Sequence, residues 1–251
     1  MANGSRDTSF VPALLVVDVQ EDFCPPNGAL AVPNSHRVVT PINALLRLPF
    51  ALKVATKDFH PPSHISFASN HAPPNNVPFA SSVTIVNPLN ASETYSSRLW
   101  PPHCVQGTPG AELLPELDAA ALDAVVEKGQ DDRVEMYSAF ADPFRAPCVA
   151  KSGLEERLKE HGITDVFVTG LAMDYCVRYT AEDAAERGWR TWVLEEATKA
   201  VDPDKWDQVK QEMEAKGVQF ASVDGEEVGR VKALTGKDKT RLHERISRAE
   251  L

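Results

Sequence analysis

The sequence predicts an α/β fold with three layers, in which helices cover both faces of a mostly parallel six-stranded sheet. Short β-rich runs that are almost entirely apolar, such as ALLVV at 13–17, recur along the chain. This pattern is typical of parallel strands that are buried on both faces. Stretches with helical spacing lie between these runs, and the length of 251 residues suits one large α/β domain. We therefore expect residues 1–251 to form a single domain.

The elements can be placed in chain order. A helix is predicted at 152–161, where Gly162 ends it. A second helix is predicted at 204–216, and a third is expected over about 175–187. The segments with strand character are 13–17, 52–56, 124–126, 166–169, 191–194 and 218–223.

Two segments do not fit this alternation. The segment near 61–102 is rich in proline, asparagine and serine and has little periodicity. It is too long for a simple connection, so we expect an inserted, structured loop over a site. From about residue 237 the chain carries many charges and few apolar residues, which predicts a solvated helix or a frayed tail.

Composition excludes several classes of function. The formal net charge of −10 and the pI near 5.2 argue against nucleic acid or an anionic membrane as the main partner. No apolar run approaches the roughly 20 residues that span a bilayer, and the first ten residues lack the pattern of a secretory signal. We therefore expect a cytoplasmic enzyme. The four cysteines form no C-x-x-C pair, so each is interpreted as a single thiol.

Reactive side chains follow four of the predicted strands. Asp18 follows the first strand, and the segment KDFH at 57–60 follows the second. Lys128 follows the third strand, and Cys176 comes shortly after the fourth. In open parallel sheets, ligands bind beyond the carboxyl ends of the strands. The sequence therefore predicts that an acid, a metal-binding pair, a lysine and a cysteine meet at one edge.

Cys176 is interpreted as a nucleophile because a strand and a turn lead into a helix at this point. The positive helix end, and Lys128 if it converges there, would lower the thiol pKa. Asp18 at a buried strand end would have a raised pKa and could exchange protons with the thiol. The alternatives are an inert buried cysteine, an aspartate that caps the next segment and a lysine that reaches solvent. Cys104, in a proline-rich loop, is the rival nucleophile.

A metal site is predicted in the segment KDFHPPSH. Asp58 and His60 are two residues apart, so in extended backbone they point the same way and could chelate one ion. A carboxylate combined with an imidazole suits zinc, iron or manganese. His103 and His64 are the candidates for a third ligand.

Five segments together resemble the nicotinamidases, which belong to the isochorismatase-like cysteine hydrolases. The resemblance covers nearly the whole chain, because the segments occur in the family's order between about residues 13 and 223. Any one of them would be a weak signal, and their agreement makes the resemblance specific. The segments are LLVVDVQEDF, TKDFHPPSHISF, LWPPHCVQGTPG, VVEKG and VTGLAMDYCV.

The resemblance implies a set of site residues. The family's cis peptide bond corresponds to Leu171–Ala172, and an oxyanion hole would form from the N–H groups of Ala172 and Cys176. One divalent metal ion is implied, with zinc first and iron or manganese as alternatives, and in some relatives a histidine matching His64 also joins it. The implied catalytic triad is Asp18, Lys128 and Cys176. The implied metal ligands are Asp58, His60 and His103. The residues that match the pyridine pocket, each with core packing as its alternative, are Phe23, Trp100, Tyr137 and Tyr175.

The function implied by the resemblance is hydrolysis of nicotinamide to nicotinate and ammonia, through a cysteine thioester, in NAD salvage. One alternative is a related cysteine amidohydrolase that acts on another small carbamoyl or ureido amide. Another is hydrolysis by metal-bound water, and a third is a binding module without activity on the same scaffold. Whether the chain forms a homo-oligomer stays open.

Overall fold

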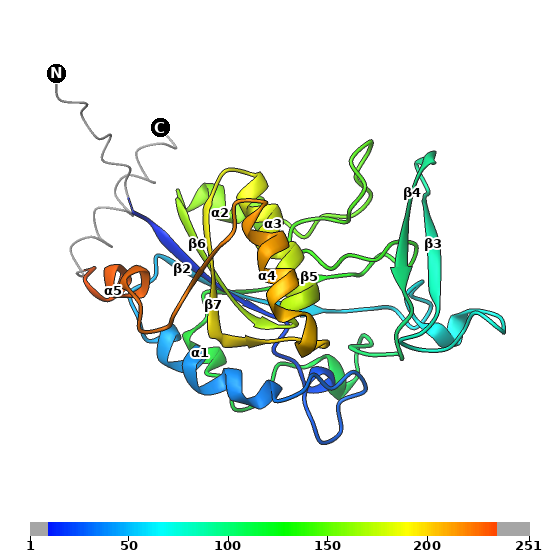
Figure 1. Ribbon diagram of the computed structural model, residues 1–251, viewed down its shortest axis with the longest axis horizontal. Helices are drawn as coiled ribbons and strands as arrows, with labels where there is room; N and C mark the ends of the chain where they lie inside the picture. The colour runs from blue at the N-terminus through cyan, green and yellow to red at the C-terminus, as the bar shows by residue number, and fades with distance from the viewer. Residues whose placement is uncertain (1–9, 235–251) are drawn as a thin grey trace.

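A six-stranded parallel sheet forms the centre of the computed structural model, which describes residues 10–234 (Figure 1). The strand order is β5-β2-β1-β6-β7-β8, and each pair of neighbours is parallel. The three-layer α/β prediction is confirmed, and all six predicted strands are present. The strands are β1 (Pro12–Val17), β2 (Leu52–Asp58), β5 (Ala124–Lys128), β6 (Asp165–Leu171), β7 (Arg190–Lys199) and β8 (Gln219–Ala221).

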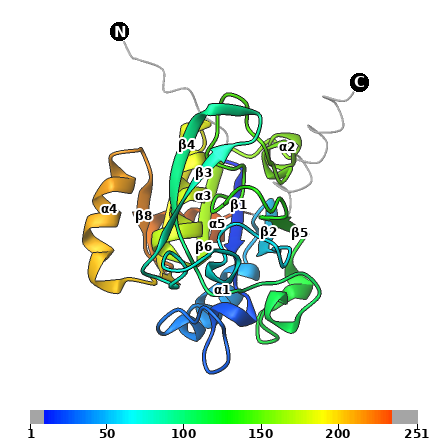
Figure 2. The ribbon, with the colours of Figure 1, turned by 90° about the vertical axis from the view of Figure 1, so that its right-hand side faces the viewer.

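Helices cover the two faces of the sheet unequally, as Figure 2 shows. One face packs against α1 (Val39–Leu46) and α5 (Glu226–Lys232), neither of which was predicted. The other face packs against α2 (Leu154–Glu160), α3 (Arg178–Glu186) and α4 (Trp206–Glu214).

Strand β1 explains why the predicted strands are almost entirely apolar. Leu14 and Val16 belong to the hydrophobic cluster under α1 and α5, whereas Leu15 and Val17 belong to the cluster under the other three helices. Successive side chains of a strand point to opposite faces, so a strand covered on both sides needs apolar residues at every position.

The turn that carries Cys176 differs from the predicted helix over 175–187. A π-helical turn at Met173–Val177 comes first, and α3 begins only at Arg178. The N–H of Val177 donates to the carbonyl of Ala172, five residues earlier, at 3.0 Å. Such wide turns occur mostly as single turns and are frequent at functional sites.

The segment near 61–102 contains a hairpin that the sequence interpretation missed. β3 (Ser82–Asn87) and β4 (Asn90–Arg98) form an antiparallel pair that stands apart from the main sheet (Figure 1). Ile85 of β3 is buried with Val134 and Phe144, so the hairpin rests on a small apolar cluster of its own. A structured loop is the prediction for this segment, and the structure has a β-hairpin in part of it instead.

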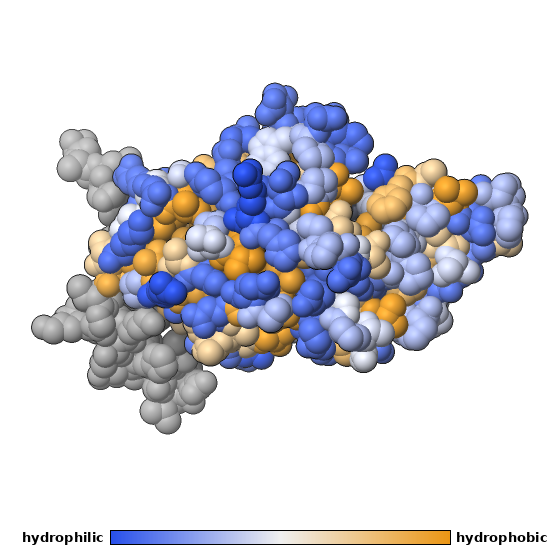
Figure 3. Space-filling model, turned by 90° about the horizontal axis from the view of Figure 1, so that it is seen from below, coloured by the Kyte–Doolittle hydropathy of each residue, from blue (hydrophilic) through white to orange (hydrophobic). Residues whose placement is uncertain are grey.

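The surface and the ends of the chain add two observations. Hydrophilic and hydrophobic residues are interspersed over the face seen in Figure 3. Within residues 10–234, none of the helices has the length and apolar character needed to cross a membrane. The charged tail predicted from about residue 237 lies outside the described residues.

Candidate active site

The reactive residues meet where the strand order reverses. The chain builds β2 and β5 on one side of β1, and then β6, β7 and β8 on the other. Asp18 directly follows β1, Asp58 and Lys128 end β2 and β5, and Cys176 lies just after β6. A crevice at the carboxyl edge between diverging crossovers is the usual binding position in open parallel sheets.

Lys128 is the charged centre of this group. Its side chain is completely buried, and its Nζ lies 3.0 Å from Oδ2 of Asp18 and 3.5 Å from Sγ of Cys176. Nζ also donates to Oδ1 of Asp58 and to the carbonyl of Met136. Sγ of Cys176 and carboxylate oxygens of both aspartates lie within 4.8 Å of one another. A buried ammonium with this many acceptors is held in one position.

The pKa values of the group follow from burial and from Lys128. Burial raises the pKa of Asp18 and raises the pKa of the Cys176 thiol well above its usual range, although Lys128 opposes both shifts. Burial alone would lower the pKa of Lys128, but the Asp18 and Asp58 carboxylates raise it well above its ordinary value. Lys128 therefore acts on the thiol in the expected direction, but burial outweighs it. These shifts favour a protonated thiol beside a charged lysine.

Asp18 is fixed by β2. The hydroxyl of Thr56 donates to Oδ1 of Asp18 at 2.5 Å, and the backbone N–H of Asp18 donates to the carbonyl of Thr56 at 3.2 Å. Asp18 also has a φ of 48°, a value that non-glycine residues adopt with strain. Such strain is found mainly where a functional side chain has to be aimed.

Three residues beside this group have the chemistry of a divalent metal site. Ligand atoms of Asp58, His60 and His103 lie within 4.8 Å of one another. Nδ1 of His60 bonds to the carbonyl of Gly129 at 2.8 Å, and Nδ1 of His103 bonds to the carbonyl of Pro101 at 2.8 Å. A carbonyl only accepts, so both Nδ1 atoms carry the proton and both Nε2 atoms offer a lone pair.

Burial and charge support this assignment. Nε2 of His60 is buried and has no hydrogen-bond partner among residues 10–234, as expected of a ligand atom that faces a site for an ion. Burial lowers the pKa of His103 to about 4, so this imidazole is neutral near pH 7. Burial would raise the pKa of Asp58, but Lys128 and the histidines hold it well below its usual range. The trio thus fits a divalent cation.

His64 is placed differently from these three residues. Its Nδ1 is 2.8 Å from the hydroxyl of Ser66, and its Nε2 is 3.1 Å from the carbonyl of Val134. Both ring nitrogens therefore have protein partners, and the ring lies against that of His60 with 4.0 Å between centroids. In this arrangement His64 supports His60 by packing.

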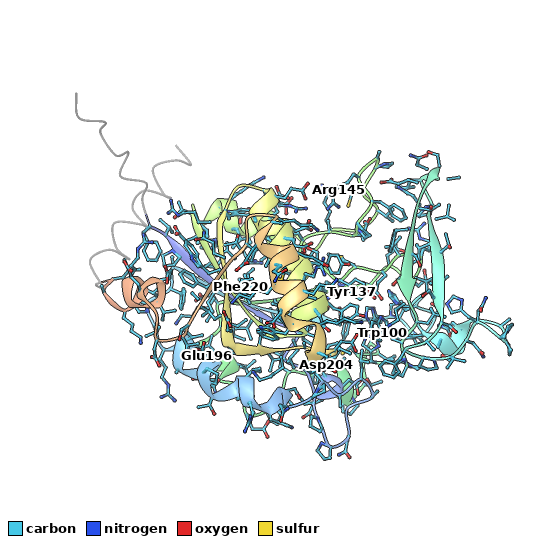
Figure 4. All side chains as sticks on the ribbon, viewed as in Figure 1. Trp100, Tyr137, Arg145, Glu196, Asp204 and Phe220 are labelled. Atoms are coloured by element: carbon cyan, nitrogen blue, oxygen red, sulfur yellow. The ribbon has the colours of Figure 1, made fainter. Side chains whose placement is uncertain are left out.

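The four predicted aromatic residues line one narrow cavity together with Cys176, Asp58 and His103. The indole N–H of Trp100 donates to the hydroxyl of Tyr137 at 2.9 Å, and the Trp100 ring meets the Tyr175 ring edge-on at 4.9 Å. The Phe23 ring lies beside the His103 ring, with 5.5 Å between their centroids. Figure 4 shows Trp100 and Tyr137 between the α/β body and the hairpin. Flat walls of this kind suit a planar ring.

Two further sequence expectations have a clear outcome. The Leu171–Ala172 peptide bond is cis, as the resemblance implied. The rival thiol, Cys104, is buried in the hydrophobic cluster under α1 and does not line the cavity. Its backbone N–H donates to Asp22 at 2.7 Å, so this loop is a structural support.

The family follows from a direct comparison. Residues 12–225 match the description "Isochorismatase domain". The chain belongs to the isochorismatase family.

Similar proteins within the isochorismatase family include nicotinamidases and a pyrazinamidase. The nicotinamidase of Acinetobacter baylyi is 42% identical over 211 residues, which are 84% of this chain and 92% of that protein. The structure of the yeast nicotinamidase Pnc1p bound to the inhibitor nicotinaldehyde has a TM-score of 0.78 at 33% identity, and the match covers 84% and 99% of the two chains. The Pyrococcus horikoshii pyrazinamidase in complex with zinc has a TM-score of 0.64 at 32% identity, with the same coverage.

The structure also adds residues to this isochorismatase-family site that sequence reasoning missed. Leu30 and Val201 line the cavity from loops, and no pattern in the sequence marks them. Glu135 lines it too, and a lone acid between apolar residues in VEMY was the available signal. Burial raises the pKa of Glu135. Gln20, two residues after Asp18, is completely buried and bonds to Asp58.

Proposed function

We propose that this chain is a nicotinamidase, which hydrolyses nicotinamide to nicotinate and ammonia. One observation carries the proposal: a single narrow cavity is lined by a thiol, by two residues of the metal-binding trio and by flat aromatic walls, and the acid and lysine pair is buried beside the thiol. Flat aromatic walls suit a planar pyridine ring, whose carboxamide would then meet the thiol. The nicotinamidases among its relatives support the same substrate.

Asp58, His60 and His103 would hold one divalent metal ion. Their donor set, one carboxylate and two imidazoles, suits zinc first, with iron or manganese as alternatives. When bound, the ion would supply a Lewis-acid contact for a pyridine nitrogen. The zinc in the related pyrazinamidase supports this assignment.

The first half of the reaction forms a thioester. Cys176 holds its proton at rest, so Asp18 accepts that proton as sulfur attacks the carboxamide carbon. The oxygen of the carboxamide becomes an oxyanion, which the N–H groups of Ala172 and Cys176 stabilise. Asp18 then returns the proton to the amide nitrogen, the C–N bond breaks and ammonia leaves. Lys128 remains charged throughout and holds Asp18 beside the thiol.

The second half releases the acid. Asp18, again ionised, accepts a proton from a water molecule that attacks the thioester carbon. The C–S bond breaks, Asp18 passes the proton to sulfur, and nicotinic acid leaves and loses its own proton to solvent to become nicotinate. We further propose a cytoplasmic location and a small-molecule substrate. The net charge of −10 supports the expectation that neither nucleic acid nor a membrane is a partner.

The decisive experiment measures ammonia release from nicotinamide by the zinc-loaded protein. Wild type should turn over, and Cys176→Ala should lose nearly all turnover while keeping its fold and its zinc content. Cys104→Ala is the matched control, because it removes a buried thiol outside the cavity, and it should stay active.

Each contrary result has a definite meaning. Turnover that persists in Cys176→Ala would exclude the thioester route and favour attack by water. A folded, zinc-loaded wild type that releases no ammonia from nicotinamide would overturn the substrate assignment, and small carbamoyl and ureido amides would be tested next.

A further inference from the structure

Arg98, at the end of β4, lies just outside the substrate cavity and contacts two of its walls. Its Nη1 donates to the hydroxyl of Tyr175 at 3.1 Å, and its guanidinium lies 5.4 Å from the centre of the Trp100 ring. Stacking on an aromatic face and donating from the planar edge is an arrangement that arginine allows and lysine does not.

The same guanidinium also contacts the loop after β7, which supplies a third wall of the cavity. Nη1 of Arg98 lies 3.5 Å from Oδ2 of Asp202. Val201, the preceding residue, lines the cavity. Both residues are held to the Cys176 turn, because the carboxylate of Asp174 accepts their N–H groups at 2.9 and 2.8 Å. Figure 4 shows Trp100 at the base of the hairpin and Asp204, close to Asp202 in the chain, on the facing end of the α/β body.

The cavity is narrow, so small displacements of these walls decide which rings it admits. Its volume is about 20 Å³. The side chains of Arg98 and Asp202 are 31% and 35% exposed, so their contact is weak enough to break and form again during turnover.

We propose that Arg98 is a specificity-determining residue that limits how far Trp100, Tyr175 and Val201 move apart. Unsubstituted pyridine and pyrazine carboxamides are admitted, and rings with an added methyl group are rejected. Arg98 does not line the cavity, so it acts by positioning the walls. This inference rests on the proposed nicotinamidase function.

The test compares nicotinamide with 5-methyl- and 6-methylnicotinamide. For each enzyme, kcat and KM are measured by ammonia release, and selectivity is the ratio of kcat/KM values for nicotinamide and the methylated amide. In Arg98→Met the walls separate further, so selectivity against at least one methylated amide should fall about 10-fold, within the range that one methyl group commands in a fitted pocket. KM for nicotinamide should rise, and its kcat should change less than 3-fold.

Matched variants separate wall positioning from a general structural role. Lys205→Met removes the other cation on Asp202, 3.0 Å away on the solvent side, and should leave selectivity unchanged. Arg98→Lys keeps the charge without the planar group, so its selectivity should fall nearly as far as that of Arg98→Met. Asp202→Asn breaks the link from the loop side and covers the case in which Arg98→Met fails to fold.

Two results would overturn the inference. One is a parallel loss of kcat/KM on all three amides in both Arg98→Met and Asp202→Asn, with selectivity unchanged within 2-fold. The other is an equal loss of selectivity in Lys205→Met. A wild type without activity on nicotinamide is a different result, because it refutes the proposed function before any variant is compared.

Discussion

Replacing Gln20 by leucine should damage the metal site through the backbone of Asp58. The Gln20 amide accepts from the N–H of Asp58 at 2.8 Å and donates to the carbonyls of Asp58 and Ala111 at 2.8 and 2.9 Å. Leucine has nearly the same size but leaves these three backbone groups without their partner. Each such group costs about 1–3 kcal/mol, so Gln20→Leu should lower the free energy of unfolding by about 3 kcal/mol or more.

Two assays measure the damage. For a domain of this size, a loss of 3 kcal/mol corresponds to a fall in Tm of about 6–12 °C. Zinc affinity should fall about 10–100-fold, as is usual when a group that orients a ligand is lost. Gln208→Leu is the control, because Gln208 is exposed on α4 and bonds only to Glu212 among the described residues. It should stay within about 0.5 kcal/mol of wild type.

The reasoning is refuted if Gln20→Leu binds zinc as tightly as wild type and unfolds within about 1 kcal/mol of it. That result would mean that β2 alone positions Asp58, without help from the buried amide.

Two further substitutions test neighbouring contacts. Gly129 has a φ of +68°, and a Cβ there would lie 2.4 Å from the His60 ring, so Gly129→Ala should weaken zinc binding more than 10-fold in a titration. Gly162→Ala is the control, because Gly162 also has a positive φ (+58°) but no atom of the described residues lies within 4 Å of its Cβ position. It should lower the stability of the protein and leave its zinc affinity unchanged. Thr56→Val removes the hydroxyl that favours ionised Asp18, so the Asp18 pKa should rise further. In a plot of kcat/KM against pH, the fall in activity on the acid side should then move to higher pH. If it does not move, Asp18 is not the base.

The residues at the strand ends could be predicted because parallel strands impose a common edge. Once 13–17, 52–56, 124–126 and 166–169 were interpreted as parallel strands, the residues after them had to meet. The sequence also indicated that Asp18 would have a raised pKa. A residue at the end of a strand that is covered on both faces is buried, and burial raises the pKa of a carboxyl group. It did not indicate that burial would outweigh Lys128 at Cys176, because that balance depends on distances and on the wide turn before α3.

Loops obey no such rule, and the missing parts of the site come from loops. Glu135, Leu30 and Val201 reach the cavity from segments whose paths depend on tertiary contacts. The hairpin was missed for the same reason. Its strands bury few side chains, so their alternation is weak in a segment rich in asparagine and serine, and the cluster around Ile85 that supports it draws on residues far along the chain. The reactive residues of the site thus follow from the edge of the sheet. The shape of the cavity and the position of Arg98 depend on the loops and the hairpin, whose paths follow no such rule.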